Sequence, residues 1–307
     1  MLQVNSSHCY YAQMEFDDMR AFVSVADTGS VSLAARELYV TQSAVTRRLQ
    51  RLENSLGTKL LNRRTRPVAL TGAGRVVLER CRRVLNEFRE VRAAASNGQL
   101  LAGEIKIGVA HALTELTFTE PIGRVRRKLP TVALRLFTGW SRELLERVRN
   151  GSLDSAVILL PEEEKLPAGV DGEKLGKERL VIVAPRRGAL ARAQTVQDLA
   201  TANWILSPEG CAARAVLRQT LLRANINMSP AIETYNYELQ LALVARNRGI
   251  TFVPERIFLR SRFRSRLRIL NVHGLNFPLT IWMVHGKSCI GLDLVIKELS
   301  QGLVERL

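Results

Sequence analysis

The sequence has little of what builds disulfide frameworks, zinc sites or membrane spans. Its four cysteines are scattered over 307 residues, without a C-x-x-C pair or a spacing typical of metal ligands. No apolar run approaches the roughly 20 residues that a membrane-spanning helix needs. The first residues also lack the basic and apolar stretches of a signal peptide. We therefore expect a cytoplasmic protein with reduced thiols, no metal site and no membrane partner.

Motifs of enzyme active sites are missing as well. The sequence contains no G-x-S-x-G nucleophile elbow, no P-loop and no cluster of metal ligands. We therefore predict no enzyme activity, no catalytic residues and no cofactor.

Acidic residues are scarce relative to basic ones. There are 29 Asp and Glu against 45 Lys and Arg, which gives a net charge of +16. Such a charge favours a nucleic acid, an acidic membrane surface or an anionic ligand as partner, and charge alone does not choose among them.

Residues 16–57 carry the signals of three helices. Apolar residues at helical spacing from Phe16 predict a first helix, which Gly29 ends. Ser30 can cap a short second helix, and Thr41 can cap a third that Gly57 ends. The third helix should turn inward the apolar residues Val45, Leu49, Leu52 and Leu56. The arrangement is a helix-turn-helix.

In a helix-turn-helix, the first turns of the second helix reach base edges in the major groove. Gln can bind adenine, Arg can bind guanine and the Thr methyl can pack on a thymine methyl. The predicted base-reading residues are Gln42, Ser43, Thr46 and Arg47. The predicted DNA-contacting set also includes Ser30, Thr41, Arg48 and Arg51, of which the two arginines are placed for phosphates. A solvated basic face is the alternative interpretation.

The stretch KLLNRRTRPVALT predicts a strand, a turn and a second strand, which together would form a wing beside the recognition helix. A wing that contacts the phosphate backbone or the minor groove needs positive charge. Its turn carries Arg63, Arg64 and Arg66. These arginines favour the DNA-contacting interpretation of the recognition helix over the solvated one.

Thr71 can cap a long helix that continues to about Ala95. Apolar residues in it alternate at spacings of four and three, as in the seam of a coiled coil. They are Val77, Cys81, Val84, Phe88 and Val91. The seam predicts dimerisation, although a core helix can show the same spacing.

From Glu104 onward, short apolar runs alternate with helical segments. The runs are EIKIGVA, VALRLF, SAVILL, RLVIVAP, NWILS, ITFVP and LTIWMV. This alternation predicts an α/β fold with parallel sheets, whose ligands bind at the carboxyl ends of the strands. An enzyme that uses such a cleft is the rival interpretation, which turnover of a cleft ligand would distinguish.

From about Met14 onward the chain resembles the LysR-type transcriptional regulators. The resemblance is carried by FVSVADTGSVSLAARELYVTQSAVTRRLQRLENSLGTKLLNR, LTGAG, GSLDSAVI, LVIVAP and LVARNRGITFVP. It implies a winged helix-turn-helix, a long linker helix, and a two-lobed periplasmic-binding-protein-like α/β domain with a small-molecule inducer between its lobes. It also implies a homodimer or homotetramer on an interrupted palindrome of double-stranded promoter DNA, with RNA polymerase as a further partner.

The domains expected on this basis are a disordered extension at 1–13, a DNA-binding domain at 14–71, a linker helix at 72–98 and an effector domain at 99–307. The resemblance implies an effector cleft lined by Ala110, His111, Ala112, Trp140, Ser141, Leu206, Ser207, Tyr235, Asn236, Val253 and Pro254.

Four positions depart from the family pattern, and one of them is Ser43, which stands where relatives often have Pro. Ala110 and Ala112 stand where relatives often carry Ser or Thr, whose hydroxyls help to bind a carboxylate. Without them only main-chain N–H groups face an anion, and a more apolar ligand fits. Asn247 stands at a usual glycine and can adopt the positive φ needed there.

Cys211 follows Gly210 at a predicted helix start, where a thiolate would be stabilised. Peroxide-sensing members of the family carry a cysteine in a similar setting, so a redox-responsive regulator is the alternative function. An architectural DNA binder without sequence preference is a third possibility, and it would lack the discrimination that the base-reading residues predict.

The stretch RSRFRSRLR places arginines at alternate positions, which would share one face of a strand. That face would be a solvated edge or a contact for DNA or an acidic partner. The arginines are Arg260, Arg262, Arg264, Arg266 and Arg268.

Overall fold

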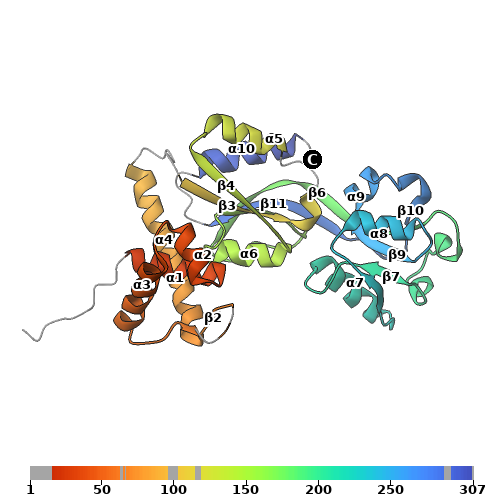
Figure 1. Ribbon diagram of the computed structural model, residues 1–307. Helices are drawn as coiled ribbons and strands as arrows, with labels where there is room; N and C mark the ends of the chain where they lie inside the picture. Colours follow the sequence, from red (N-terminus) through yellow and green to blue (C-terminus); the bar gives the residue numbers. More distant parts are fainter. Residues whose placement is uncertain are drawn as a thin grey trace, which may run out of the picture. The chain divides into compact units, whose positions relative to one another are not determined.

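The structure is a computed structural model that describes residues 16–62, 65, 67–95, 103–114, 119–286 and 292–305. It divides into two compact units (Figure 1). The first unit ends at Gln99 and takes in Asn150–Ser152, and the second unit comprises the remainder from Leu100. The predicted extension at residues 1–13 lies outside the described residues. The two units are described separately.

The first unit consists of helices with one small hairpin. Its elements are α1 (Phe16–Thr28), α2 (Val31–Glu37), α3 (Gln42–Ser55), β1 (Leu61–Asn62), β2 (Ala69–Leu70) and α4 (Gly72–Ala95). The two strands pair antiparallel. The structure therefore confirms the predicted helix-turn-helix, the two strands after it and the long helix that follows.

Three hydroxyl side chains cap these helices as the sequence predicts. Each accepts a hydrogen bond from the main-chain N–H three residues later, which would otherwise have no partner at the start of a helix. The distances are 3.4 Å for Ser30, 3.2 Å for Thr41 and 2.9 Å for Thr71. The caps fix where α2, α3 and α4 begin.

The core of the first unit lies among α1, α2, α3 and the first half of α4. Val45, Leu49 and Leu52 are buried in it, as predicted. Leu56 is 39% exposed, so its predicted inward position is wrong. The reason is that α3 ends at Ser55 and the chain turns away at Gly57 with a φ of +63°, so residue 56 no longer follows the helical spacing.

The second unit contains a mixed nine-stranded sheet in the order β4-β3-β5-β11-β6-β9-β7-β8, with β10 beside β6. Its strands are β3 (Gly103–Ala110), β4 (Val132–Gly139), β5 (Ser155–Pro161), β6 (Val170–Pro185), β7 (Trp204–Leu206), β8 (Pro230–Glu233), β9 (Ile250–Pro254), β10 (Leu267–Leu270) and β11 (Pro278–Gly286). Its α-helices are α5 (Thr119–Lys128), α6 (Ser141–Arg149), α7 (Ala212–Arg223), α8 (Tyr237–Val244), α9 (Glu255–Arg260) and α10 (Asp293–Val304). The predicted α/β fold is confirmed.

The prediction of purely parallel sheets is wrong for β6, β10 and β11. β11 runs antiparallel to β5 and β6, and β6 runs antiparallel to β9 and β10. Apolar periodicity identifies a strand but not its direction. The chain reaches β11 only after β10, and β11 then returns between β5 and β6 and runs opposite to both.

The strand β6 takes part in two lobes of this unit. Its residues 170–179 pair with β11, whereas its residues from Leu180 onward pair with β9 and β10. Lobe I comprises β3, β4, β5, β11 and the first part of β6, with α5, α6 and α10 (Figure 1). Lobe II comprises the second part of β6, β7 to β10 and α7 to α9, with a core around Trp204, Leu217 and Phe252.

Candidate nucleic-acid interface and effector cleft

One side of α3 is open, while the opposite side packs into the core of the first unit. The open side carries Gln42, Ser43 and Arg47, which are exposed, and Thr46, which is half-buried beside them. The side chain of Thr41 lies next to that of Ser43, with 2.9 Å between their hydroxyl oxygens. The structure thus brings the four predicted base-reading residues to one edge at the start of the helix.

A groove of about 640 Å³ runs beside this edge, between the start of α2, α3 and the segment before β2. Five hydroxyl side chains line it, those of Thr28, Ser30, Ser32, Thr46 and Thr65. Hydroxyl groups donate hydrogen bonds to phosphate oxygens, so the groove suits a nucleic-acid backbone. No local sequence pattern had indicated Ser32 or Thr65. The predicted wing residues Arg63, Arg64 and Arg66 lie outside the described residues.

Two arginines of α3 are engaged with α1 rather than left free. The Arg51 guanidinium contacts the fully buried carboxylate of Asp18 at 2.6 Å, and Arg48 contacts Asp17 at 2.9 Å. These ion pairs join the recognition helix to the helix behind it. Both arginines were predicted on phosphates, and this structural role was missed because the partners are more than thirty positions away in the chain.

Tyr39 is a further residue for which the sequence predicted no role. It lies in the turn between α2 and α3, its side chain is 96% exposed and its φ is +55°. A bulky residue in this left-handed conformation costs of the order of 1 kcal/mol or more, which glycine would avoid. The turn therefore carries a locally strained aromatic residue whose side chain is directed to solvent.

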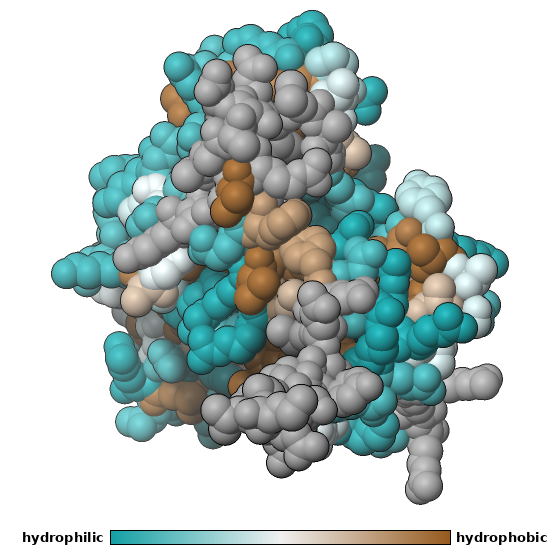
Figure 2. Space-filling model, turned by 90° about the vertical axis from the view of Figure 1, so that its left-hand side faces the viewer, coloured by the Kyte–Doolittle hydropathy of each residue, from teal (hydrophilic) through white to brown (hydrophobic). Residues whose placement is uncertain are grey.

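The residues of the predicted α4 seam fall into two groups, one buried in the core of the first unit and one exposed. Cys81 is only 4% exposed and lies in the core of its own unit, with Val77 partly buried beside it. Val84, Phe88 and Val91 are 44–66% exposed. Figure 2 faces the side that carries this helix and shows apolar side chains in a narrow stripe between hydrophilic ones. Including Cys81 in the dimer seam is wrong, because a heptad pattern does not distinguish core contacts from contacts with a second chain.

A cavity of about 60 Å³ lies between the two lobes of the second unit. Lobe I contributes the ends of β3 and β4, with His111 and Trp140, and lobe II contributes the start of α7. Its lining is mostly apolar and includes no Lys, Arg, Asp or Glu. A cavity of this composition favours an uncharged ligand, because a buried ion without a partner is costly.

Three rings meet at this cavity. The ring centroids of His111 and Trp140 are 4.8 Å apart, those of Trp140 and Tyr235 5.8 Å, and those of His111 and Tyr235 5.7 Å. Burial lowers the pKa of His111, with Glu143 opposing the shift more weakly. The imidazole is therefore mainly neutral at pH 7 and adds no full charge to the cavity.

The structure brings together six of the eleven residues predicted for the cleft. These are Ala110, His111, Ala112, Trp140, Ser141 and Pro254. Tyr235 joins them through its ring contacts.

The other four predicted residues do not line the cavity and take part in the packing or hydrogen bonding of the fold. Leu206 and Val253 are at most 1% exposed and belong to the apolar cores, so their prediction is wrong. Alternate residues of a strand point to opposite faces, and motif position alone does not say which. Ser207 accepts a hydrogen bond from Gln240 at 3.3 Å, and Asn236 caps α8.

Cys211 and Tyr237 line the cavity from lobe II and were not assigned to the cleft. Cys211 does precede the first residue of α7, as predicted. Burial nevertheless raises the pKa of its thiol, a shift that hydrogen bonds from main-chain N–H groups and Ser207 oppose. The expected stabilised thiolate is therefore not what this site favours. Burial also raises the pKa of Tyr237.

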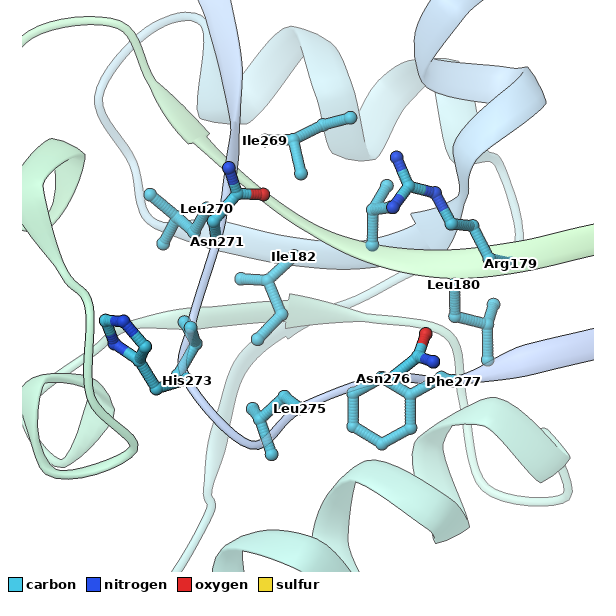
Figure 3. Close-up of a pocket in the computed structure, with 12 residues that line it drawn as sticks. Arg179, Leu180, Ile182, Ile269, Leu270, Asn271, His273, Leu275, Asn276 and Phe277 are labelled. Atoms are coloured by element: carbon cyan, nitrogen blue, oxygen red, sulfur yellow. The ribbon is translucent and has the colours of Figure 1, made fainter.

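A second cavity of about 210 Å³ lies in lobe II, where residues 271–277 leave the sheet between β10 and β11 (Figure 3). Arg179 and Asn276 lie toward one end and His273 toward the other. Arg179 is bound by Glu255, and the His273 ring lies 2.8 Å from the carbonyl oxygen of Gln194. None of the predicted cleft residues lines this cavity.

Over the described part of the chain, no cluster of His, Cys, Asp and Glu is arranged to bind a metal ion. Within the same residues, no helix combines the length and apolar character needed to cross a membrane.

Two family models match the chain, one for each unit. Residues 16–75 match the family described as "Bacterial regulatory helix-turn-helix protein, lysR family", and residues 98–290 match the "LysR substrate binding domain". The chain belongs to the LysR family. It is thus a DNA-binding transcriptional regulator with an effector-binding domain, and not an enzyme.

The chain is also similar to individual proteins and solved structures. The HTH-type transcriptional regulator CzcR of Bacillus cereus (strain ZK / E33L) is 31% identical over 242 residues, which cover 79% of this chain and 81% of that protein. A full-length OxyR variant from Pseudomonas aeruginosa matches 95% of both chains with a TM-score of 0.74 at 21% identity. CbnR complexed with its target DNA matches 95% of this chain and 100% of that one, with a TM-score of 0.56 at 20% identity. The two structures show the shared fold.

The ion pair between α1 and α3 gives a prediction about stability. Replacing Arg51 with Gln leaves the carboxylate of Asp18 buried without its cation, which should lower the free energy of unfolding by about 3 kcal/mol. Thermal and urea unfolding of the full chain measure this. The control is Arg20→Gln, because Arg20 forms an exposed pair with Asp17 that should contribute under about 1 kcal/mol. Equal losses in the two variants would contradict the structural role of Arg51.

Proposed function

We propose that the open edge of α3 reads the bases of an interrupted palindrome in promoter DNA, and that a small uncharged molecule in the cleft alters this binding. The observation that carries the proposal is the grouping of Gln42, Ser43, Thr46 and Arg47 on the exposed side of a helix whose other side is fixed in a core. These side chain types match the donor and acceptor patterns of the major groove. The hydroxyl-lined groove beside them supplies backbone contacts.

Pairing of two chains supports the proposal that the operator is an interrupted palindrome. Val84, Phe88 and Val91 are exposed apolar residues on α4, and a second copy of the same helix would cover them. A two-fold dimer places two recognition helices on two half-sites. Family membership supports further assembly to a homotetramer, and a regulator bound at a promoter has RNA polymerase as its neighbour.

The arrangement of the two lobes supports the proposal that a small molecule binds in the cleft. The cavity has walls from both lobes, so a bound molecule contacts both and favours their closed arrangement. Ala110 and Ala112 offer no hydroxyl groups, and the lining offers no cation to a carboxylate. Closure of the lobes would change the spacing of the paired recognition helices. The ligand would thereby shift an equilibrium between two arrangements of the assembled chains.

The base-reading role of Arg47 can be tested once the operator is recovered by sequencing the genomic DNA that the protein binds in its host. Arg47→Ala should weaken binding to the operator about 10- to 100-fold while leaving weak, salt-dependent binding to a scrambled duplex. Fluorescence anisotropy with both duplexes measures this, and Arg20→Ala serves as a control away from the open edge. An unchanged ratio of the two affinities would remove Arg47 from the base-reading set.

Dimerisation through α4 can be tested at Val91, which is 66% exposed. Val91→Glu should shift the sedimenting species toward smaller mass, because it places charge in the apolar seam. The matched control is Leu222→Glu, since Leu222 is 48% exposed on α7. The same mass distribution for Val91→Glu and wild type would exclude this seam.

The uncharged character of the effector can be tested with benzamide and benzoate, which are similar in size and differ in charge. Benzamide should raise the thermal unfolding temperature of the full chain, and benzoate should raise it less, because the cavity cannot compensate a carboxylate. Ala213→Leu should abolish the shift by filling the cavity. An equal shift with both compounds would contradict the preference for an uncharged ligand. No shift with either would show that the cavity does not bind an aromatic molecule of this size.

A further inference from the structure

Lobe II carries a group of exposed arginines that the functions above do not use. It combines the chain after β6, the turn after α8 and the segment that includes the short 3-10 helix Arg264–Arg266 before β10. We name it the arginine surface, and its members are Arg186, Arg187, Arg246, Arg248, Arg264, Arg266 and Arg268, all exposed.

Hydrogen bonds join the three segments at this place. The main-chain N–H of Arg186 donates to the carbonyl of Arg266 at 2.9 Å, and its guanidinium donates to the carbonyl of Ser265 at 3.2 Å. The Arg266 guanidinium donates to the carbonyl of Ala245 at 3.0 Å, which brings in the turn after α8. The arginines are therefore gathered by the fold and not only by the sequence.

The geometry differs from the strand that the sequence predicts. Arg260 ends α9, a 3-10 turn spans Arg264–Arg266, and β10 starts only at Leu267. The predicted single strand face is therefore wrong. Asn247 adopts a φ of +60° in the turn after α8, as its replacement of a usual glycine predicts. This tight turn carries Arg246 and Arg248 on its two sides.

The charge of this region is not balanced within the described chain. Residues 245–270 contain eight arginines and one acidic residue, Glu255, which binds Arg179. Of the other arginines, Arg256 pairs with Glu178 and Arg262 with Glu238. Among the described residues, no carboxylate pairs with a member of the arginine surface. Uncompensated like charges repel one another, and a polyanion would relieve the repulsion.

The composition of the surface favours a nucleic-acid backbone over a protein partner. Protein interfaces centre on apolar or aromatic anchors and are depleted of charge at the core. Here Phe263 is only partly exposed, and the Arg262 guanidinium lies 4.9 Å from its ring centroid. Phosphate contacts need only cations, and the planar guanidinium suits phosphate oxygens.

We propose that the arginine surface binds the phosphate backbone of double-stranded DNA outside the sequence read by α3. The proposal rests on the proposed function, since DNA bound by the first unit of the chain is held at a raised effective concentration for the second. Binding at this surface adds affinity and no base specificity.

The test compares wild type with R187Q/R248Q/R264Q/R268Q in the full chain. These four side chains make no hydrogen bond in the described structure that the fold needs, whereas Arg186 and Arg266 do and are kept. The control R126Q/K165Q/R223Q/K297Q removes the same charge from exposed residues elsewhere in the second unit. Anisotropy is measured over a range of KCl concentrations, on a duplex that ends at the operator and on one with long flanks.

On the flanked duplex, the arginine-surface variant should bind about tenfold or more weakly, and its plot of log affinity against log salt should be less steep by up to about 3.6, for four phosphate contacts. It should match wild type on the short duplex, and the control should match wild type on both. A variant equal to the control on the flanked duplex would overturn the proposal. Loss of RNA polymerase recruitment with unchanged DNA binding would also overturn it, assigning the surface to a protein. Failure of wild type to prefer the operator would instead refute the proposed function.

Discussion

The rotation of α3 about its own axis is the constraint on which DNA recognition depends. Val45, Leu49 and Leu52 must all enter the core, and the helical period then leaves no choice about which residues face outward. The buried carboxylate of Asp18 fixes the same rotation through Arg51 on the neighbouring helical face. Apolar burial and a buried ion pair therefore orient the same edge of α3, and a small change in either would move all of the predicted base-reading side chains together.

A comparable constraint acts in the second unit, where β6 belongs to both lobes. Its first part pairs with β11 and its second part with β9 and β10, so the lobes are joined by continuous backbone hydrogen bonds. The cavity forms beside this shared strand, with Leu180 at the change of partner among its lining residues. Relative movement of the lobes would then involve bending of this shared strand, which would couple occupancy of the cavity to the shape of the domain.

Local signals in the sequence were sufficient for much of the fold. Capping hydroxyls, apolar periodicity and turn residues act between positions a few residues apart, and so the helix starts at Ser30, Thr41 and Thr71 were predictable. The inward orientation of Leu206 and the burial of Cys81 depend instead on distant segments. The same holds for strand direction in the sheet, which apolar patterns do not indicate.

The two partner sites also differ in their use of charge. The chain has 16 more basic than acidic residues, so some basic side chains must lack a carboxylate partner. The place where such side chains gather indicates where an anionic partner could bind. The cleft contains no ionised side chain, whereas the arginine surface groups seven cations without acidic partners among the described residues. Screening by salt weakens contacts between exposed charges and scarcely affects apolar burial. On the functions proposed above, ionic strength should act on the DNA contacts and leave binding of an uncharged ligand in the cleft almost unchanged, so that the two inputs to the regulator are physically separate.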